Sequence, residues 1–230
     1  MAGAQFQEMI IELTDAKRDQ DHLETILFNC PGIPDRTDFI LGRSVDDPFD
    51  RMLDIAKKLE ALGVSAIAIP CVSSAFMNDR LQAEIKVPLL YGINKTARDI
   101  KGRRLTKAGI MATEGSLKTC VIQNALEEYG IEPVLPSRED TKKIMDLIYR
   151  DVKSGREADI ALFDEVRDNL MAKGAQTIIL GCTELSVIYR TQHLEGDITD
   201  IMRSLATESI KACGKRVKRG DIVYAVSKHS

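Results

Sequence analysis

Residues 63–71 read Gly-Val-Ser-Ala-Ile-Ala-Ile-Pro-Cys, and residues 174–182 read Gly-Ala-Gln-Thr-Ile-Ile-Leu-Gly-Cys. Each stretch runs from a glycine through a short apolar segment to a cysteine, at the same spacing of 8 residues (71 − 63 = 182 − 174 = 8). A short, nearly continuous apolar run is typical of a parallel strand that is buried on both faces. The two stretches therefore predict an internal duplication, with a central strand before each cysteine.

A helical pattern of apolar residues precedes each of these stretches. It runs from Phe49 to Leu62 behind the Asp-Pro start at 47–48, and again from Ile160 to Leu170. Other segments predict strands at 87–90, 108–111, 132–135 and 222–225, and helices at 5–13, 118–129, 137–152 and 198–211. This alternation predicts an α/β fold of two pseudo-symmetric domains, with parallel sheets flanked by helices.

The polar, charged stretch 101–107 lies between strong elements, so we expect the chain to cross between the domains there. The expected N-terminal α/β domain spans residues 1–98 and is completed by residues 206–230, and the second α/β domain spans residues 99–205. Ligands of open parallel sheets bind beyond the carboxyl ends of the strands. We therefore expect the active site in the cleft between the domains.

The composition restricts the class of function. With 44% hydrophobic and 29% charged residues and a formal net charge of −3, the chain shows no basic surface for nucleic acid. No apolar run approaches the ~20 residues of a membrane span, and the first residues do not resemble a secretion signal. We therefore expect a cytoplasmic protein that acts on a small molecule, with no nucleic-acid or membrane partner.

The five cysteines are too few and too scattered for a disulfide framework, and their spacing suggests no metal site. Cys71 and Cys182 alone hold equivalent places in the repeat, each where a substrate would bind. Two thiols on opposite sides of one carbon can invert it, because one removes the α-proton while the other delivers a proton. Helix starts directly after each cysteine would favour the thiolate. Structural or surface roles are expected for Cys30, Cys120, Cys213, His22, His193 and His229.

The motifs around the two cysteines resemble those of a known protein family. Residues 66–71, Ala-Ile-Ala-Ile-Pro-Cys, and residues 178–185, Ile-Ile-Leu-Gly-Cys-Thr-Glu-Leu, are similar to the two signatures of aspartate/glutamate racemases. Residues 33–37, Ile-Pro-Asp-Arg-Thr, and residues 149–155, Tyr-Arg-Asp-Val-Lys-Ser-Gly, extend the resemblance. It implies a racemase that needs no pyridoxal phosphate or other cofactor and is often a homodimer. The implied substrate is an acidic amino acid, aspartate first and glutamate next.

The resemblance also implies the residues of the site. Arg36 and Lys153 would hold the substrate carboxylates, because guanidinium engages a carboxylate bidentately and ammonium supplies a compact charge. The turn at 113–116 would line the cleft with main-chain amides. The expected site consists of Cys71 and Cys182 as proton-transfer groups and, as substrate-binding residues, Arg36, Ser73, Thr113, Lys153, Thr183 and Glu184.

Two departures from the family leave alternatives open. Asparagine and threonine normally follow the first cysteine, whereas Val72 and Ser73 stand here, and valine cannot hydrogen-bond a substrate. The family also begins with a strand and a glycine-rich loop before the helix that corresponds to residues 5–13, so we expect one central strand and one wall of the cleft to be absent. The alternatives are another carbon acid, as in hydantoin racemases, maleate isomerases and arylmalonate decarboxylases, or a catalytically impaired binding or regulatory protein.

Overall fold

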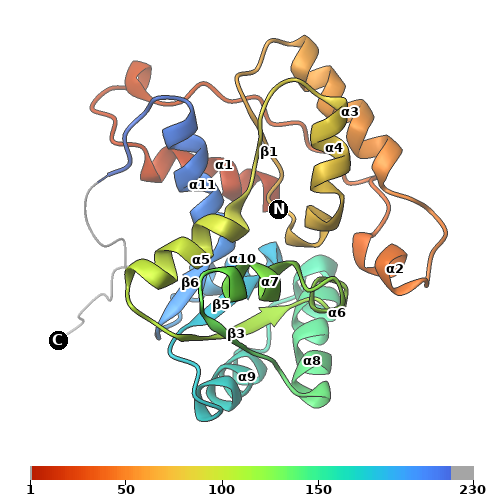
Figure 1. Cartoon of the computed structure of the whole chain (residues 1–230), viewed down its shortest axis with the longest axis vertical. Helices are drawn as coiled ribbons and strands as arrows, with labels where there is room; N and C mark the ends of the chain where they lie inside the picture. The colour runs from red at the N-terminus through yellow and green to blue at the C-terminus, as the bar shows by residue number, and fades with distance from the viewer. Residues whose placement is uncertain (1, 219–230) are drawn as a thin grey trace.

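The computed structural model describes residues 2–218, and in it two groups of parallel strands are packed among helices (Figure 1). The predicted strand at 222–225 lies outside the described residues. The first half of the chain opens with α1 (Ala2–Leu13), an amphipathic helix that buries one face. It continues through α2 (Arg36–Leu41), α3 (Phe49–Ala61), β1 (Ile67–Ala68), α4 (Asn78–Glu84), β2 (Leu89–Leu90) and α5 (Gly92–Gly102), with 3₁₀ helices at Asp19–Asp21 and Val72–Met77.

The first sheet consists of β1 and β2, which pair in parallel. Met52 of α3 and Leu81 of α4 pack with Ile67 of β1 in one apolar cluster. A second cluster joins α1 to the C-terminal helix α11 (Ile201–Ala212), through residues such as Met9 and Leu205. The last described helix therefore returns to the first half of the chain, where Figure 1 shows it beside α1.

The second half contains a larger sheet of four parallel strands in the order β4-β3-β5-β6. Successive side chains of β5 point to opposite faces, so Ile178 and Leu180 pack with Phe163, whereas Ile179 packs with Ile122. Helices therefore cover both faces of this sheet. Its elements are β3 (Lys107–Ala112), α6 (Glu114–Lys118), α7 (Val121–Glu128), β4 (Glu132–Val134), α8 (Arg138–Met145), α9 (Ile160–Ala172), β5 (Ile178–Gly181), α10 (Thr183–Thr191) and β6 (Ile198–Asp200).

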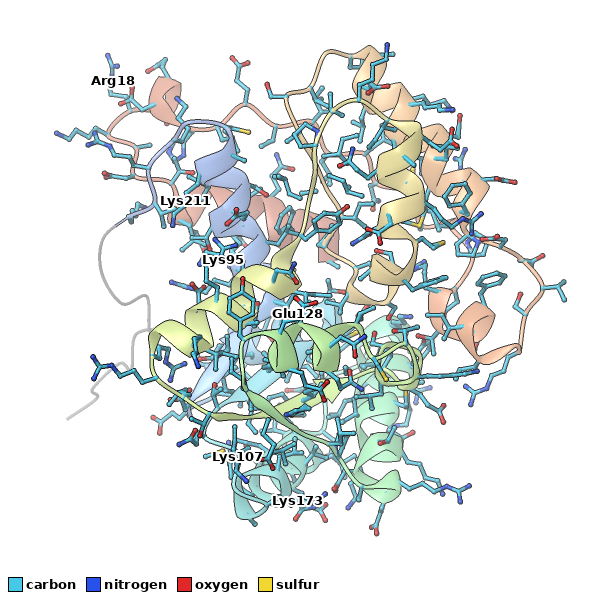
Figure 2. The ribbon with its side chains drawn as sticks, in the orientation of Figure 1. Arg18, Lys95, Lys107, Glu128, Lys173 and Lys211 are labelled. Atoms are coloured by element: carbon cyan, nitrogen blue, oxygen red, sulfur yellow. The ribbon has the colours of Figure 1, made fainter. Side chains whose placement is uncertain are left out.

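The predicted α/β class with parallel sheets and flanking helices is confirmed. The chain passes from α5 to β3 through residues 103–106, within the stretch where we expected the crossing. We propose that the two sheets mark two domains with the boundaries given above, 1–98 with 206–230 and 99–205. Charged side chains such as Arg18, Lys173 and Lys211 point outward from the ribbon (Figure 2).

Several elements differ from the expectation. The helix predicted at 198–211 begins at Ile201, because Ile198 and Thr199 continue the sheet beside β5 and Asp200 caps the helix by accepting the N–H of Met202 at 2.9 Å. The helix predicted at 118–129 is wrong as a single element, since Cys120 adopts a left-handed φ of 57° and α7 starts after it.

Two further differences concern the lengths of elements. Ser137 caps a helix as predicted, but α8 widens into a π-helix over Asp146–Asp151 instead of continuing to 152. The central strand predicted before Cys71 is limited to Ile67 and Ala68, because its one ladder partner among the described residues is the equally short β2. Within residues 2–218, no helix is both long enough and apolar enough to cross a bilayer.

Candidate active site

The two cysteines of the repeat each stand between a strand and a helix. Cys182 follows β5 directly and is the residue before α10, and Cys71 lies three residues beyond β1 and precedes the 3₁₀ helix Val72–Met77. The glycines that open the two stretches, Gly63 and Gly174, both adopt positive φ values, 78° and 95°, after helices of 13 residues. The predicted repeat is therefore present in the local structure as well as in the spacing.

Both cysteines line one small pocket between the two halves of the chain. Its volume is about 30 Å³, which is room for about two water molecules. The pocket gathers all the residues that the sequence analysis assigned to the site. It is lined by Asp35, Arg36, Thr37, Cys71, Val72, Ser73, Thr113, Tyr149, Lys153, Cys182, Thr183 and Glu184.

The helix α2 closes this pocket from the first half of the chain. Arg43, just after α2, forms an ion pair of 2.8 Å with Glu114 at the start of α6. A Cβ atom on Gly115 would lie 3.0 Å from the Cα of Thr37, so α2 and α6 are in close backbone contact. The ion pair and this close contact therefore hold α2 against α6 at one side of the pocket.

Cys71 lies beside a cation. The Nη2 of Arg36 donates to the Cys71 sulfur at 3.4 Å, and its Nη1 donates to the carbonyl of Pro34 at 3.1 Å. These bonds hold the guanidinium against the sulfur. A neighbouring guanidinium stabilises a thiolate more than a thiol, because only the thiolate carries a negative charge. The surroundings of Cys71 therefore suit a proton acceptor.

Cys182 has the opposite surroundings. It is buried, and its thiol donates to Oε2 of Glu184 at 2.9 Å, the atom that also accepts the hydroxyl of Thr183 at 2.9 Å. Burial raises the pKa of Cys182 well above its ordinary value, and the negative charge of Glu184 raises it further. Cys71, which lines the same pocket, also contributes to this rise of the pKa. These surroundings therefore favour the thiol form of Cys182.

Lys153 is engaged by an acid that the sequence analysis did not assign. Its Nζ forms an ion pair of 3.0 Å with Asp35, and the Tyr149 hydroxyl donates to both oxygens of the same carboxylate at 3.1 Å. Burial would raise the pKa of Asp35, but the bond and charge of Lys153 outweigh it and lower that pKa. In this structure the ammonium group of Lys153 is therefore engaged by the carboxylate of Asp35.

Three buried hydroxyls bond one another at the meeting of the two halves. Ser73 lies 3.0 Å from Thr113 and 2.9 Å from Ser116, and Thr113 and Ser116 are 3.0 Å apart. Thr113 also caps α6 by accepting the N–H of Ser116. Ser73 and Thr113 line the pocket. Their hydroxyls also bond to each other, and this bond links the 3₁₀ helix after Cys71 to the end of β3.

Val72, the residue that departs from the family pattern, lines the pocket and is 7% exposed. Its methyl groups pack in the apolar cluster of the larger sheet, with residues such as Ile100 and Ile122. Val72 therefore packs in this apolar cluster on one side and presents an apolar surface to the pocket on the other.

Residues outside the pocket include the three other cysteines, of which Cys120 is exposed and Cys30 and Cys213 are intermediate. Within the described part of the chain, no group of three or more His, Cys, Asp or Glu side chains could hold a metal ion. The residues that the sequence analysis missed are Asp35, Thr37 and Tyr149. Asp35 and Thr37 flank Arg36 within the quoted motif, and Tyr149 begins the other motif, so their adjacency to expected site residues was the available signal.

Comparisons with known proteins give the family. The model of the Asp/Glu/hydantoin racemase family matches residues 1–208. The broad specificity amino-acid racemase RacX of Bacillus subtilis is 25% identical over 203 residues, which cover 86% of each chain. The structure of Picrophilus torridus aspartate racemase superposes with a TM-score of 0.78 and 27% identity, over 94% of this chain and 91% of that chain. Glutamate racemase of Corynebacterium glutamicum is 22% identical over 211 residues, which are 86% of this chain and 75% of that protein. The match extends over both halves that form the pocket, and the chain therefore belongs to the Asp/Glu/hydantoin racemase family.

Proposed function

We propose that this chain racemises an acidic amino acid, aspartate first and glutamate as the near alternative, by proton transfer between Cys71 and Cys182. The observation that carries the proposal is the unequal setting of the two sulfurs in one pocket. Arg36 donates to Cys71, whereas burial and the carboxylate of Glu184 keep Cys182 protonated. A stereoinverting transfer needs one base and one acid at the start of each turnover.

The proposed reaction moves one proton off the α-carbon and another onto it. The Cys71 thiolate removes the α-proton and becomes a thiol, while Cys182 gives its proton to the opposite face and becomes a thiolate. The opposite enantiomer reacts with the two roles exchanged. After each turnover the proton distribution between the sulfurs must be restored before the same enantiomer can react again.

The two cations of the pocket support an acidic substrate. Arg36 and Lys153 are the arginine and the lysine among its lining residues, and each could bind one carboxylate of aspartate. Lys153 becomes available only when the substrate displaces Asp35. Thr183 and Glu184 stand beside Cys182, where we propose that they contact the substrate. The family resemblance also supports a homodimer, which sedimentation analysis would test.

The test is incubation of the purified chain with single enantiomers of aspartate and glutamate in deuterium oxide. Chirality and deuterium at the α-carbon are followed together during the first few per cent of turnover. We expect product that carries deuterium while the remaining substrate retains hydrogen, because each thiol exchanges with solvent and serves one face only. If none of these substrates loses its chirality or its α-hydrogen, the proposal is wrong, and another carbon acid or a binding or regulatory role are the alternatives.

A further inference from the structure

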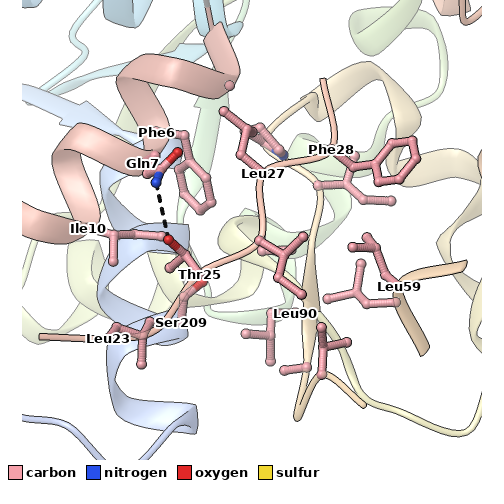
Figure 3. A pocket seen from close by; sticks show the side chains of 18 of the residues that line it. Phe6, Gln7, Ile10, Leu23, Thr25, Leu27, Phe28, Leu59, Leu90 and Ser209 are labelled. Carbon is pink, nitrogen blue, oxygen red and sulfur yellow. Dashed lines mark hydrogen bonds between the residues drawn. The ribbon is translucent and has the colours of Figure 1, made fainter. Parts of the chain in front are cut away.

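Charge distinguishes the candidate active site from a larger pocket beside α1. The larger pocket has a volume of about 710 Å³, and the side chains labelled around it in Figure 3 are mostly apolar, such as Phe6 and Leu27. The described lining of the candidate active site instead carries two cations and two carboxylates, whose formal charges cancel: Arg36, Lys153, Asp35 and Glu184. A substrate that enters the candidate active site therefore meets both signs of charge.

The positive charge of Lys153 is already compensated by these carboxylates. Its Nζ forms the ion pair of 3.0 Å with Asp35 and lies 3.8 Å from the centre of the Tyr149 ring. Burial would lower the pKa of Lys153, but the bond with Asp35 and the surrounding negative charges, that of Glu184 among them, outweigh burial and raise the pKa. The ammonium group is therefore charged, and its countercharge is part of the protein.

Asp35 is held in place by more than Lys153. Its Oδ1 accepts the main-chain N–H groups of Thr37 and Asp38 at 2.8 and 3.1 Å, as the N-cap of α2. The Tyr149 hydroxyl also donates to both oxygens of the carboxylate at 3.1 Å. Movement of this carboxylate away from Lys153 would break these bonds and leave α2 without its cap. We therefore expect a substrate side chain to meet Lys153 and Asp35 together.

Together, Lys153 and Asp35 offer a hydrogen-bond donor beside an acceptor. The ammonium group donates, and the carboxylate accepts. A side-chain amide carries the matching groups, because its carbonyl oxygen accepts and its NH₂ group donates. A side-chain carboxylate only accepts, and beside Asp35 it would bring two negative charges together. The pair therefore suits a neutral amide better than a second carboxylate.

We propose that asparagine is a further substrate of this pocket, used at least as well as aspartate, and that Asp35 determines this preference. The inference rests on the proposed racemisation by Cys71 and Cys182. Asparagine differs from aspartate by an NH₂ group in place of one oxygen, so the shape of the pocket cannot separate the two. Charge can separate them, because aspartate adds a negative charge that needs a partner and asparagine adds none.

The reaction on asparagine balances in the same way as the reaction on aspartate. The bond between the α-carbon and its hydrogen breaks as the proton passes to the sulfur of Cys71. A new bond forms on the opposite face with the proton that leaves Cys182. The side-chain amide is not broken, since its carbonyl oxygen accepts from Lys153 and its NH₂ group donates to Asp35. The product is therefore asparagine of the opposite configuration.

Initial rates of the full chain with single enantiomers of asparagine and aspartate in deuterium oxide test the inference. Chiral separation and mass spectrometry identify the product, which for L-asparagine should be D-asparagine with one carbon-bound deuterium. We expect kcat/KM for asparagine to equal or exceed kcat/KM for aspartate. A lower value for asparagine, or none, would overturn this inference and leave the proposed function standing. Turnover of asparagine alone would support the inference and overturn the acidic substrate, and turnover of neither would overturn both.

The variant Asp35→Asn tests whether the charge of Asp35 sets the preference. Aspartate would then meet Lys153 without a competing carboxylate, so the ratio of kcat/KM for asparagine to that for aspartate should fall about tenfold or more. Asp38→Asn is the matched control, because Asp38 lies on α2 but outside the pocket lining, and it should leave the ratio unchanged. Equal ratios in the wild type and in Asp35→Asn would contradict the role of Asp35.

A second variant covers the case in which Asp35→Asn does not fold. Glu184→Gln removes the other carboxylate whose charge acts on Lys153, and the same ratio should fall. The ratio compares two substrates in one variant, so a general loss of turnover on removal of Glu184 does not by itself move it. An unchanged ratio in Glu184→Gln would then contradict the inference.

Discussion

Replacement of Asp35 by asparagine tests whether the pocket holds Lys153 through charge. The variant Asp35→Asn keeps the shape of the side chain and its capping oxygen, which accepts the N–H groups of Thr37 and Asp38 at 2.8 and 3.1 Å. It removes the negative charge that faces Lys153 at 3.0 Å. A hydrogen bond between charged groups contributes about 1.5–3 kcal/mol. Because the Lys153 and Asp35 side chains are 31% and 29% exposed, solvent screening places the expected loss of unfolding free energy at about 1–2 kcal/mol near pH 7.

The pH dependence of this loss has a definite sign. The folded state lowers the pKa of Asp35, so the charged carboxylate stabilises the wild type above the pKa of the unfolded chain, about 3.9. That contribution disappears as the pH falls through the lower folded-state pKa, where the wild type also becomes neutral at this position. Urea denaturation of both proteins from about pH 7 to about pH 3 should therefore give two stability curves that converge on the acid side.

The same variant has a kinetic readout. Lys153 loses its internal competitor, so KM for aspartate should fall while kcat changes less. Asp35→Ala is the control, because it removes both the charge and the cap of α2 and should cost about 1 kcal/mol more. A stability difference that stays constant from neutral to acid pH, or is absent at neutral pH, would refute the assigned role of the Asp35 charge.

Three other predictions concern the same pocket. Val72→Asn should raise kcat/KM for aspartate about tenfold and lower the unfolding free energy by about 1–3 kcal/mol, because the amide enters an apolar cluster; unchanged kinetics in a folded variant would reject the missing hydrogen bond as the limitation. Glu184→Gln should move the alkaline limb of the kcat/KM profile to lower pH for both enantiomers, since the pKa of Cys182 loses the part of its rise that comes from the Glu184 charge; an unmoved limb would contradict this. Substitution of the cysteines outside the pocket by alanine should leave racemisation near wild type in kinetic assays, and a large loss would show that the proton path includes one of them: Cys30, Cys120 or Cys213.

The positions of the two cysteines at strand ends could be predicted, because the apolar patterns of strands and helices are local. They locate each element in the sequence and do not depend on contacts between distant residues. Gly63 and Gly174 mark equivalent turns, and parallel strands bring their carboxyl ends to one edge. The expected site residues could then be gathered from the family motifs around them. The structure places all of these residues in one pocket, and their roles remain predictions.

The contacts between those residues could not be predicted, because they depend on how distant segments meet. Asp35 and Lys153 are 118 positions apart, and nothing in either motif shows that one neutralises the other. The hydroxyls of Ser73 and Thr113 likewise meet only in the folded chain, across 40 positions. Local signals were more informative at Asp200, whose capping carboxylate marks the start of α11 more sharply than the apolar pattern does.

Racemisation by the single variants Cys71→Ala and Cys182→Ala tests the two-thiol mechanism most directly. Both variants are assayed with each enantiomer of aspartate, beside Cys120→Ala as a control at an exposed cysteine. In the proposed mechanism each pocket cysteine serves as base in one direction and as acid in the other, so either substitution should reduce turnover in both directions by about a hundredfold or more. Near wild-type turnover by either variant, in either direction, would contradict the mechanism and assign the proton transfer to another group.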